Sequence, residues 1–135
     1  MPALLLLCLL TSALAAAQAP PDTLIDCAAL RRTVGSVRYA DTMPEYRAGG
    51  SAGLVRFIGA TVDRKLRRRG AGKVFVSFVV TAAGAVRCPE VTRGLGPPYD
   101  AEALRVARQF GAFVPATKDG RAVPCWFTVP ITFGR

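Results

Sequence analysis

The pattern of apolar and polar positions is clearest in the C-terminal half of the chain. From Lys73 to Thr81 the residues read KVFVSFVVT, apolar at almost every position. This run predicts a strand that is buried on both faces in the middle of a sheet. Residues 82–84 indicate a turn, and residues 85–93 predict a second, more polar strand in which Pro89 marks a bulge or a sheet edge. The two strands are predicted to form a hairpin.

Two longer segments have helical periodicity. Residues 52–69 place apolar side chains three and four positions apart, which predicts one amphipathic helix with Ser51 as its N-cap and Gly70 at its end. A second helix is predicted to begin with Asp100 as its cap and to carry its apolar residues on one side. Residues 26–32 predict one or two further helical turns.

The last strand is predicted over residues 121–133, where apolar positions alternate with others. Pro124 and Pro130 have the same parity in this alternation, so their missing N–H groups point the same way. Because proline is confined to edges and bulges, that side is the open edge of the sheet if no bulge intervenes. This edge has two interpretations. Its free amides bind an added strand from a partner, or the two prolines serve only to block aggregation. The candidate partner-binding residues are Cys125, Trp126, Phe127, Thr128, Val129 and Thr132.

These elements follow one another in the order α-β-β-α-β and predict an α+β fold. Both helices are expected on one face of a three-stranded antiparallel sheet with the strand order second-first-third. Glycine and proline punctuate the loops at residues 44–50 and 114–120. We therefore predict one domain over residues 43–135, preceded by a weakly patterned segment at residues 18–42.

The N-terminal segment is apolar and uncharged from residue 3 to residue 17. It is shorter than the roughly 20 residues that span a bilayer, and it ends in the small residues Ala15, Ala16 and Ala17. This combination predicts a cleaved signal peptide at residues 1–17, with an uncleaved anchor as the alternative. The mature chain is then exported to the periplasm or the cell envelope.

Because the mature chain is predicted to be exported to an oxidising compartment, its cysteines can form disulfides. Cys27, Cys88 and Cys125 remain after cleavage, which indicates one disulfide and one thiol, or three buried thiols. In the predicted strand order Cys88 and Cys125 lie on either side of the middle strand, about 9–10 Å apart. A disulfide requires a Cα separation below roughly 7 Å. A bond between those two would therefore contradict the strand order, whereas a bond from Cys27 to either would not.

Composition and charge exclude several classes of function. The chain has 135 residues, of which 51% are hydrophobic, and 18 Lys and Arg face 9 Asp and Glu, a formal charge of +9. The sequence contains no histidine, which excludes Ser-His and Cys-His catalysis and imidazole metal sites. No other constellation supports an enzyme, a cofactor or a metal.

The densest group of cations has two interpretations. They complement a helix C-terminus and face solvent, or they form a patch for anionic lipid or cell-wall polymer. Export argues against nucleic acid as a partner. Trp126 likewise either packs on the outer face of the sheet or anchors a partner. The cations are Arg64, Lys65, Arg67, Arg68, Arg69 and Lys73.

An ordered set of motifs runs through the same region. It comprises a G-x-V-x-V-x-F-x-V strand, a glycine turn, D-x-E-A-L, a P-A-x-x-x-G-x-x-V loop and a closing V-P-I-x-F. Upstream, MPEY at residues 43–46 is followed by Gly49 and Gly50. This order and spacing resemble the C-terminal domain of TonB-family energy transducers. The matching positions are Gly72, Val74, Val76, Phe78, Val80, Gly84, Asp100, Glu102, Ala103, Leu104, Pro115, Gly120, Val123, Pro130, Ile131 and Phe133.

The resemblance implies a function in energised transmembrane transport. Such domains bind outer-membrane TonB-dependent receptors, whose extended segment adds as a strand beside the last strand of the domain. Full transducers also have a membrane anchor and a Pro-rich linker, neither of which is evident here, so an anchored or motor partner is expected to supply the membrane segment. The Tyr-Pro pair that usually precedes the first strand is also absent. Whether the domain forms a homodimer is left open.

The alternative function is that of a basic envelope protein that binds anionic polymer or lipid through Arg64–Lys73.

Overall fold

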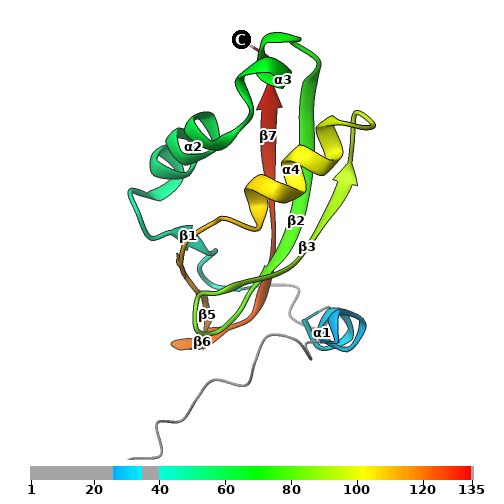
Figure 1. Cartoon of the computed structure of the whole chain (residues 1–135). Helices are drawn as coiled ribbons and strands as arrows, with labels where there is room; N and C mark the ends of the chain where they lie inside the picture. The colour runs from blue at the N-terminus through cyan, green and yellow to red at the C-terminus, as the bar shows by residue number, and fades with distance from the viewer. Residues whose placement is uncertain (1–25, 35–39, 135) are drawn as a thin grey trace, which may run out of the picture.

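A three-stranded antiparallel sheet forms the centre of the molecule (Figure 1). The computed structural model describes residues 26–34 and 40–134, so the predicted signal peptide lies outside the described residues. Strand β2 (Gly72–Val80) lies between β3 (Val86–Arg93) and β7 (Cys125–Phe133). The α+β class and the predicted strand order are confirmed.

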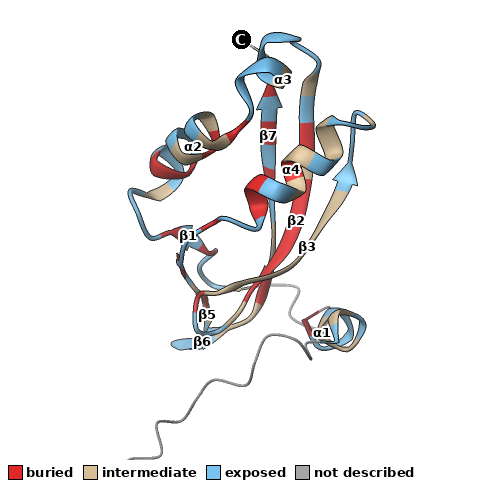
Figure 2. Cartoon of the chain, in the orientation of Figure 1, coloured by how far each residue is buried: buried red, intermediate tan, exposed pale blue. Residues whose placement is uncertain are grey.

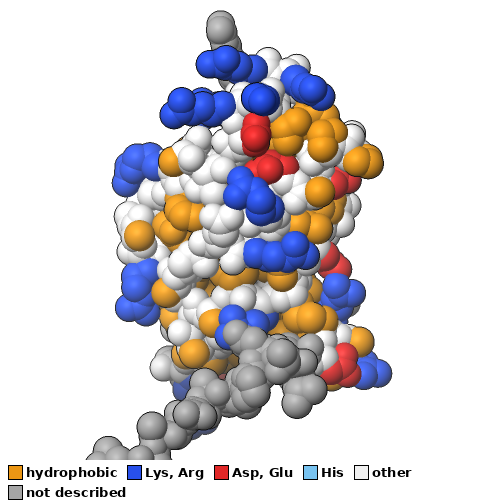
Figure 3. Space-filling model, viewed as in Figure 1, with side chains coloured by type: hydrophobic (Ala, Val, Ile, Leu, Met, Phe, Trp, Pro, Cys, Tyr) orange, Lys and Arg blue, Asp and Glu red, His pale blue; other side chains and the backbone are white. Residues whose placement is uncertain are grey.

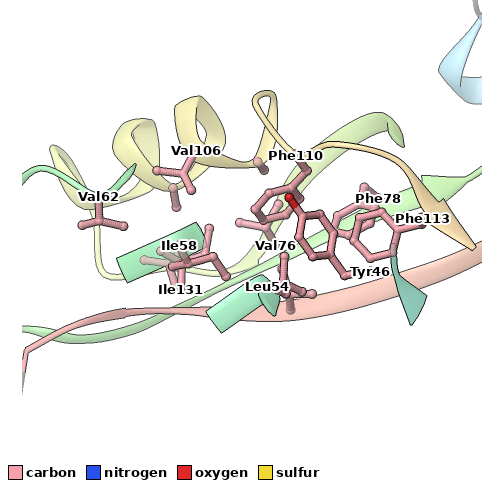
Figure 4. Close-up of a cluster of buried hydrophobic side chains, with 14 of the residues drawn as sticks. Tyr46, Leu54, Ile58, Val62, Val76, Phe78, Val106, Phe110, Phe113 and Ile131 are labelled. Atoms are coloured by element: carbon pink, nitrogen blue, oxygen red, sulfur yellow. The ribbon is translucent and has the colours of Figure 1, made fainter. Parts of the chain in front are cut away.

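Helices α2 (Gly50–Thr61) and α4 (Tyr99–Ala107) cover the same face of this sheet, as predicted. We call it the inner face. The alternate residues of β2 that begin with Val74 point toward these helices and are fully buried. Figure 2 marks most of β2 as buried, and Figure 4 shows buried side chains gathered between the helices and the sheet. Full burial of each such side chain contributes roughly 1.5–3 kcal/mol, so this layer provides most of the stability.

The first long helix is not continuous, contrary to the prediction for residues 52–69. It divides into α2 and a short helix, α3 (Arg64–Arg68), because Val62 adopts an extended conformation. The carboxylate of Asp63 accepts the backbone N–H groups of Lys65 and Leu66 and thereby caps α3.

The two predicted N-caps are also wrong. Helix α2 begins at Gly50 with Gly49 as its N-cap, so Ser51 already lies inside the helix. Helix α4 begins at Tyr99 after Pro98. The carboxylate of Asp100 accepts the backbone N–H of Leu95 instead, at 2.9 Å, and so ties the preceding loop to the first turn of the helix.

The predicted last strand is divided as well. Pro124 separates β6 (Arg121–Val123), which pairs with β5 (Ala116–Lys118), from β7, which pairs with β2. Two further short strands, β1 (Glu45–Tyr46) and β4 (Phe113–Val114), pair with each other. The first lies inside the loop predicted at residues 44–50, and the second ends at the first residue of the loop predicted at 114–120. Tyr46 and Phe113 bring their rings together there, with centroids 5.3 Å apart.

Helix α1 (Cys27–Val34) confirms the predicted helical turns at residues 26–32 and lies on the outer face of the sheet. Cys27 is bonded to Cys88 of β3, with a Cα separation of 5.8 Å. Arg31 forms an ion pair with Glu90, and its guanidinium lies over the ring of Trp126. These partners belong to the outer face because Glu90 is opposite Ser77 and Trp126 is opposite Val79, whose side chains alternate with the inward ones.

Cys88 reaches α1 because β3 is irregular at this point. The pairing of β2 with β3 shifts between Ser77 and Val79, where Cys88 and Pro89 form a bulge, as predicted from Pro89. Cys88 has a φ of 53°, in the left-handed region that few non-glycine residues adopt. A bulge leaves its extra residue unpaired, and here that residue holds the disulfide. The pairing of Cys27 is compatible with the strand order, as the sequence required.

Candidate functional site: the open edge of strand β7

The β2–β7 ladder decides which amides of β7 point away from β2, and within residues 26–34 and 40–134 no other strand pairs with β7. It runs without a shift from Gly72 opposite Phe133 to Val80 opposite Cys125. Pro130 has no N–H and lies opposite Phe75. In an antiparallel ladder alternate pairs exchange both hydrogen bonds, so Pro130 belongs to a pair that exchanges none. Residues of the same parity therefore direct their backbone groups away from β2. The amides concerned, here named the edge amides, are those of Trp126, Thr128 and Thr132.

The free edge of β7 has two depressions beside it. We name the first the proximal depression; it has a volume of about 300 Å³ and is lined by Met43, Pro44, Glu45, Tyr46, Ser51, Leu54 and Phe127. We name the second the distal depression; it has a volume of about 260 Å³ and is lined by Val55, Ile58, Gly59, Arg67, Pro130, Thr132 and Gly134. Phe127 and Thr132 are five residues apart, about 17 Å in an extended strand. A segment of five or six residues would span both depressions.

Apolar side chains on the rim of these depressions are exposed. Met43 is 57% exposed and Val55 is 68% exposed, and both rank among the most exposed large apolar residues of the described chain. Together with the edge amides they provide what an extended polypeptide requires, namely main-chain partners on one side and apolar contacts on the other.

The six cations of the predicted patch are all exposed and lie at the distal end of β7. We call them the basic cluster. Figure 3 shows Lys and Arg side chains gathered at the end of the molecule where α3 lies. Arg67 lines the distal depression, and Lys73 is opposite Thr132 in the ladder. Of the six cations, Arg67 lies beside the open edge through the distal depression, whereas Lys73 belongs to β2 on the paired side of β7.

The predicted partner-binding residues divide by position. Phe127 lies between α2 and the sheet, with its ring centroid 5.9 Å from that of Phe78, and it lines the proximal depression. Cys125 and Val129 are buried on the inner face. Burial raises the pKa of the Cys125 thiol, which donates to the carbonyl O of Trp126 at 3.3 Å.

Trp126 and Thr128 are engaged on the outer face. The guanidinium carbon of Arg31 lies 5.8 Å from the centroid of the Trp126 ring, so the indole packs within the chain. The Thr128 hydroxyl is hydrogen-bonded to that of Ser77 at 2.6 Å. Trp126 and Thr128 therefore contribute their backbone groups, rather than their side chains, to the open edge.

Sequence reasoning did not identify the residues that α2 and the preceding loop contribute to the depressions. Met43, Leu54 and Val55 lie 70 or more residues before β7, and nothing in their local pattern shows that they face it. The exposed position of Val55 among apolar helix residues was the one available signal.

The described residues contain no group of three His, Cys, Asp or Glu side chains arranged to hold a metal ion. No helix in this part of the chain combines the length and apolar character that crossing a membrane requires.

The comparisons with known proteins point to one family. The family model described as the Gram-negative bacterial TonB protein C-terminal matches residues 63–134, more than half of the chain. No curated protein and no solved structure matches the chain. The matched region contains α3, β2, β3, α4 and β7, and therefore the whole sheet with its open edge. The chain belongs to the family of Gram-negative bacterial TonB C-terminal domains.

Proposed function

We propose that this domain captures an extended segment of an outer-membrane TonB-dependent receptor by strand addition to β7. The observation that carries the proposal is the unbroken β2–β7 ladder, which leaves the edge amides of Trp126, Thr128 and Thr132 on the open side of β7. Family membership supports the class of partner, because TonB C-terminal domains are envelope domains that act by binding and transduction.

The two depressions support the same proposal. Each intramolecular main-chain hydrogen bond contributes roughly 0.5–1.5 kcal/mol net, so a few bonds along one edge bind a short segment only weakly. Apolar side chains of the segment that enter the proximal and distal depressions would add to the affinity and set the register. Residues i and i+2 of an added strand face the same side, so the preferred segment carries alternate apolar residues.

The remaining parts of the proposal concern the cell. The apolar segment at residues 3–17 serves as a cleaved signal peptide that delivers the domain to the periplasm. A membrane-anchored or motor partner supplies the energised step of transport. The domain contributes binding and no catalysis, and it needs no cofactor.

Amide NMR on residues 18–135 tests the proposal. The titrant is a set of uncharged extended peptides from receptor N-termini, at about 150 mM salt, where surface attraction is screened beyond about 8 Å. We expect the largest shifts at the amides of Trp126, Thr128 and Thr132. Val55→Ser should weaken the binding without unfolding the domain, because Val55 is mostly exposed.

Two other results would contradict strand addition. Absence of shifts along β7 at millimolar peptide would remove the proposed site. Shifts confined to the basic cluster on addition of an anionic polymer would favour the alternative function as an envelope-surface protein.

A further inference from the structure

The disulfide lies beside the edge of the sheet opposite β7. This edge is strand β3, on which Cys88 carries the bond to Cys27. Both cysteines are only partly buried. Cys88 also lines a depression of about 680 Å³, here named the β3 depression, which is bounded by residues 83–89, 108 and 110–112. A solute in this depression therefore comes close to the bond while the sheet stays folded.

The β3 depression and α1 lie on different sides of Cys88. Helix α1 carries Cys27 and lies on the outer face, whereas residues 110–112 follow α4, which covers the inner face. A thiolate attacks a disulfide sulfur from the side away from the sulfur that leaves. The β3 depression is thus the side from which the Sγ of Cys88 is open to attack, with Cys27 as the leaving group.

Cations bound the β3 depression. Arg108 is exposed on its rim, and Arg87 lines it from β3. The carboxylates closest in sequence to the two cysteines are engaged: Glu90 is paired with Arg31, and Asp26 accepts a backbone N–H in the first turn of α1. The reactive form of a thiol is the thiolate, an anion. A cationic rim therefore raises the local concentration of the attacking group.

Helix α1 depends on the disulfide for its position. Its other contacts with the sheet include the exposed ion pair between Arg31 and Glu90, and exposed pairs contribute little. An isolated helix of eight residues is marginal in water. On the outer face that α1 covers, Trp126 lies opposite Val79, which is fully buried. Opening the bond would release α1, let it unwind and expose this apolar surface.

We propose that Cys27–Cys88 is a thiol–disulfide exchange site, which a dithiol reductant opens through the β3 depression to release α1. One thiolate of the dithiol attacks the Sγ of Cys88, a mixed disulfide forms, and Cys27 leaves as a thiolate. The second thiolate of the dithiol attacks the sulfur of its own molecule in the mixed disulfide, and Cys88 leaves. The dithiol loses two electrons and becomes a disulfide, the two cysteines gain them, and both cysteines take up a proton from water.

This site lies beyond the proposed function, because it belongs to the opposite edge of the sheet from β7. It is a place of covalent modification by a reductant of the dithiol class. Its consequence is a change in what covers the outer face of the sheet.

The kinetics of reduction test whether the bond opens in the folded state. Residues 18–135 with Cys125→Ala are treated with dithiothreitol, and the two released thiols are counted by alkylation and mass spectrometry. We expect the rate to rise in proportion to dithiothreitol without a plateau. Ile131→Val is the destabilised control, since its side chain is buried in the core away from the bond. Reduction through global unfolding would be about fivefold faster in this variant, and that acceleration, or a plateau, would overturn the proposal.

Two monothiols of opposite charge test the route of attack. They are 2-mercaptoethanesulfonate and cysteamine, and the ratio of their rates is compared between variants, so that the intrinsic reactivity of each thiol cancels. We expect Arg108→Glu to lower the ratio of the anionic to the cationic rate about fivefold. The matched control is Arg68→Glu on α3, at the other end of the molecule from α1, which should keep the ratio (Figure 1). An equal fall in both variants, or none in Arg108→Glu, would contradict this route.

Peptide mapping identifies the sulfur that is attacked. The mixed disulfide with 2-mercaptoethanesulfonate should form on Cys88, and its formation on Cys27 would contradict attack from the β3 depression.

Spectra of the reduced chain test the release of α1. The emission of Trp126 should shift to the red and the amide signals of α1 should lose their helical shifts, while the signals of β2 stay in place. Unchanged emission after both thiols have appeared would overturn the release. Loss of the β2 signals as well would show that the bond holds the whole fold and would also overturn it.

Discussion

Cys27 and Cys88 are 61 residues apart in the chain and are joined by a disulfide that fixes α1 against the outer face of the sheet. The same helix places Arg31 over Trp126 and beside Glu90. A covalent bond, an ion pair and a cation–ring contact thus converge on the outer face, where the sequence left Trp126 either to pack or to anchor a partner.

Removing the disulfide should release α1. We expect the double variant Cys27→Ser, Cys88→Ser to lose about 2–4 kcal/mol of unfolding free energy, because the bond closes a long loop in the unfolded chain. Trp126 is the only tryptophan, so its fluorescence should shift to the red as Arg31 leaves the ring. Urea titration and emission spectra measure both. Cys125→Ala is the control that keeps the disulfide, and an unchanged spectrum in the double variant would contradict the role of the bond in holding α1.

Proline at position 128 should abolish strand addition with a small effect on stability. The N–H of Thr128 points away from β2, so Thr128→Pro removes an edge amide and leaves the β2–β7 ladder intact. The substitution also removes the hydroxyl that contacts Ser77, which costs about 1 kcal/mol. Thr128→Val removes only the hydroxyl and should still bind. If both variants bind the uncharged peptide with equal affinity, the amide of Thr128 has no part in binding.

A side chain at Gly84, in the turn between β2 and β3, should destabilise the domain. A Cβ at Gly84 would lie 2.1 Å from the carbonyl O of Phe113, and the φ of Gly84 is 84°. Gly96 has a similar φ of 86° but open space around the position of a Cβ. We expect Gly96→Ala to cost about 1 kcal/mol from the backbone alone and Gly84→Ala to cost several times more. Thermal unfolding of the two variants gives the difference, and equal costs would show that the contact with Phe113 relaxes easily.

The stability that the Asp63 cap of α3 contributes should depend on pH. Hydrogen bonds from the backbone N–H groups of Leu66 and Lys65 lower the pKa of Asp63 below its ordinary value of 3.8. A lowered pKa in the folded state contributes stability that is present above 3.8 and is lost as the pH falls through the folded value. We expect Asp63→Ala to destabilise the domain at neutral pH, and its difference from the wild type to shrink at a second pH chosen below 3.8. Urea midpoints at the two pH values measure this, and a constant difference would assign the effect to packing instead.

The sheet and its edge were predictable because their signals are local. The nearly continuous apolar run around Val76 and Phe78 identifies a central strand. Pro130 identifies the edge because proline lacks an N–H in any environment. The division of the first long helix at Asp63 was not predicted. An acidic residue at this position is as compatible with the exposed surface of a continuous helix as with the N-cap of a new one. The pairing of Glu45–Tyr46 with Phe113–Val114 has too few residues to show a period.

The site was predictable only in part, because its other half depends on contacts distant in sequence. The edge amides follow from parity within one strand. The depressions, however, require α2 to lie beside β7, and the position of Arg67 requires its bond to Gly59. The position of α1 depends on a disulfide whose partners the sequence left open. Such contacts carry no periodic signal.

The full-length pairing of β7 with β2 has a mechanical consequence. A segment added to β7 and pulled along its own axis would load its main-chain hydrogen bonds in shear, so that several must break together. A pull across the strands would instead open them one at a time, beginning at one end. The load in shear passes from the segment to β7 and then to β2, the buried centre of the sheet. The fold is therefore suited to hold a tethered segment against an axial force and to release it when the direction of pulling changes.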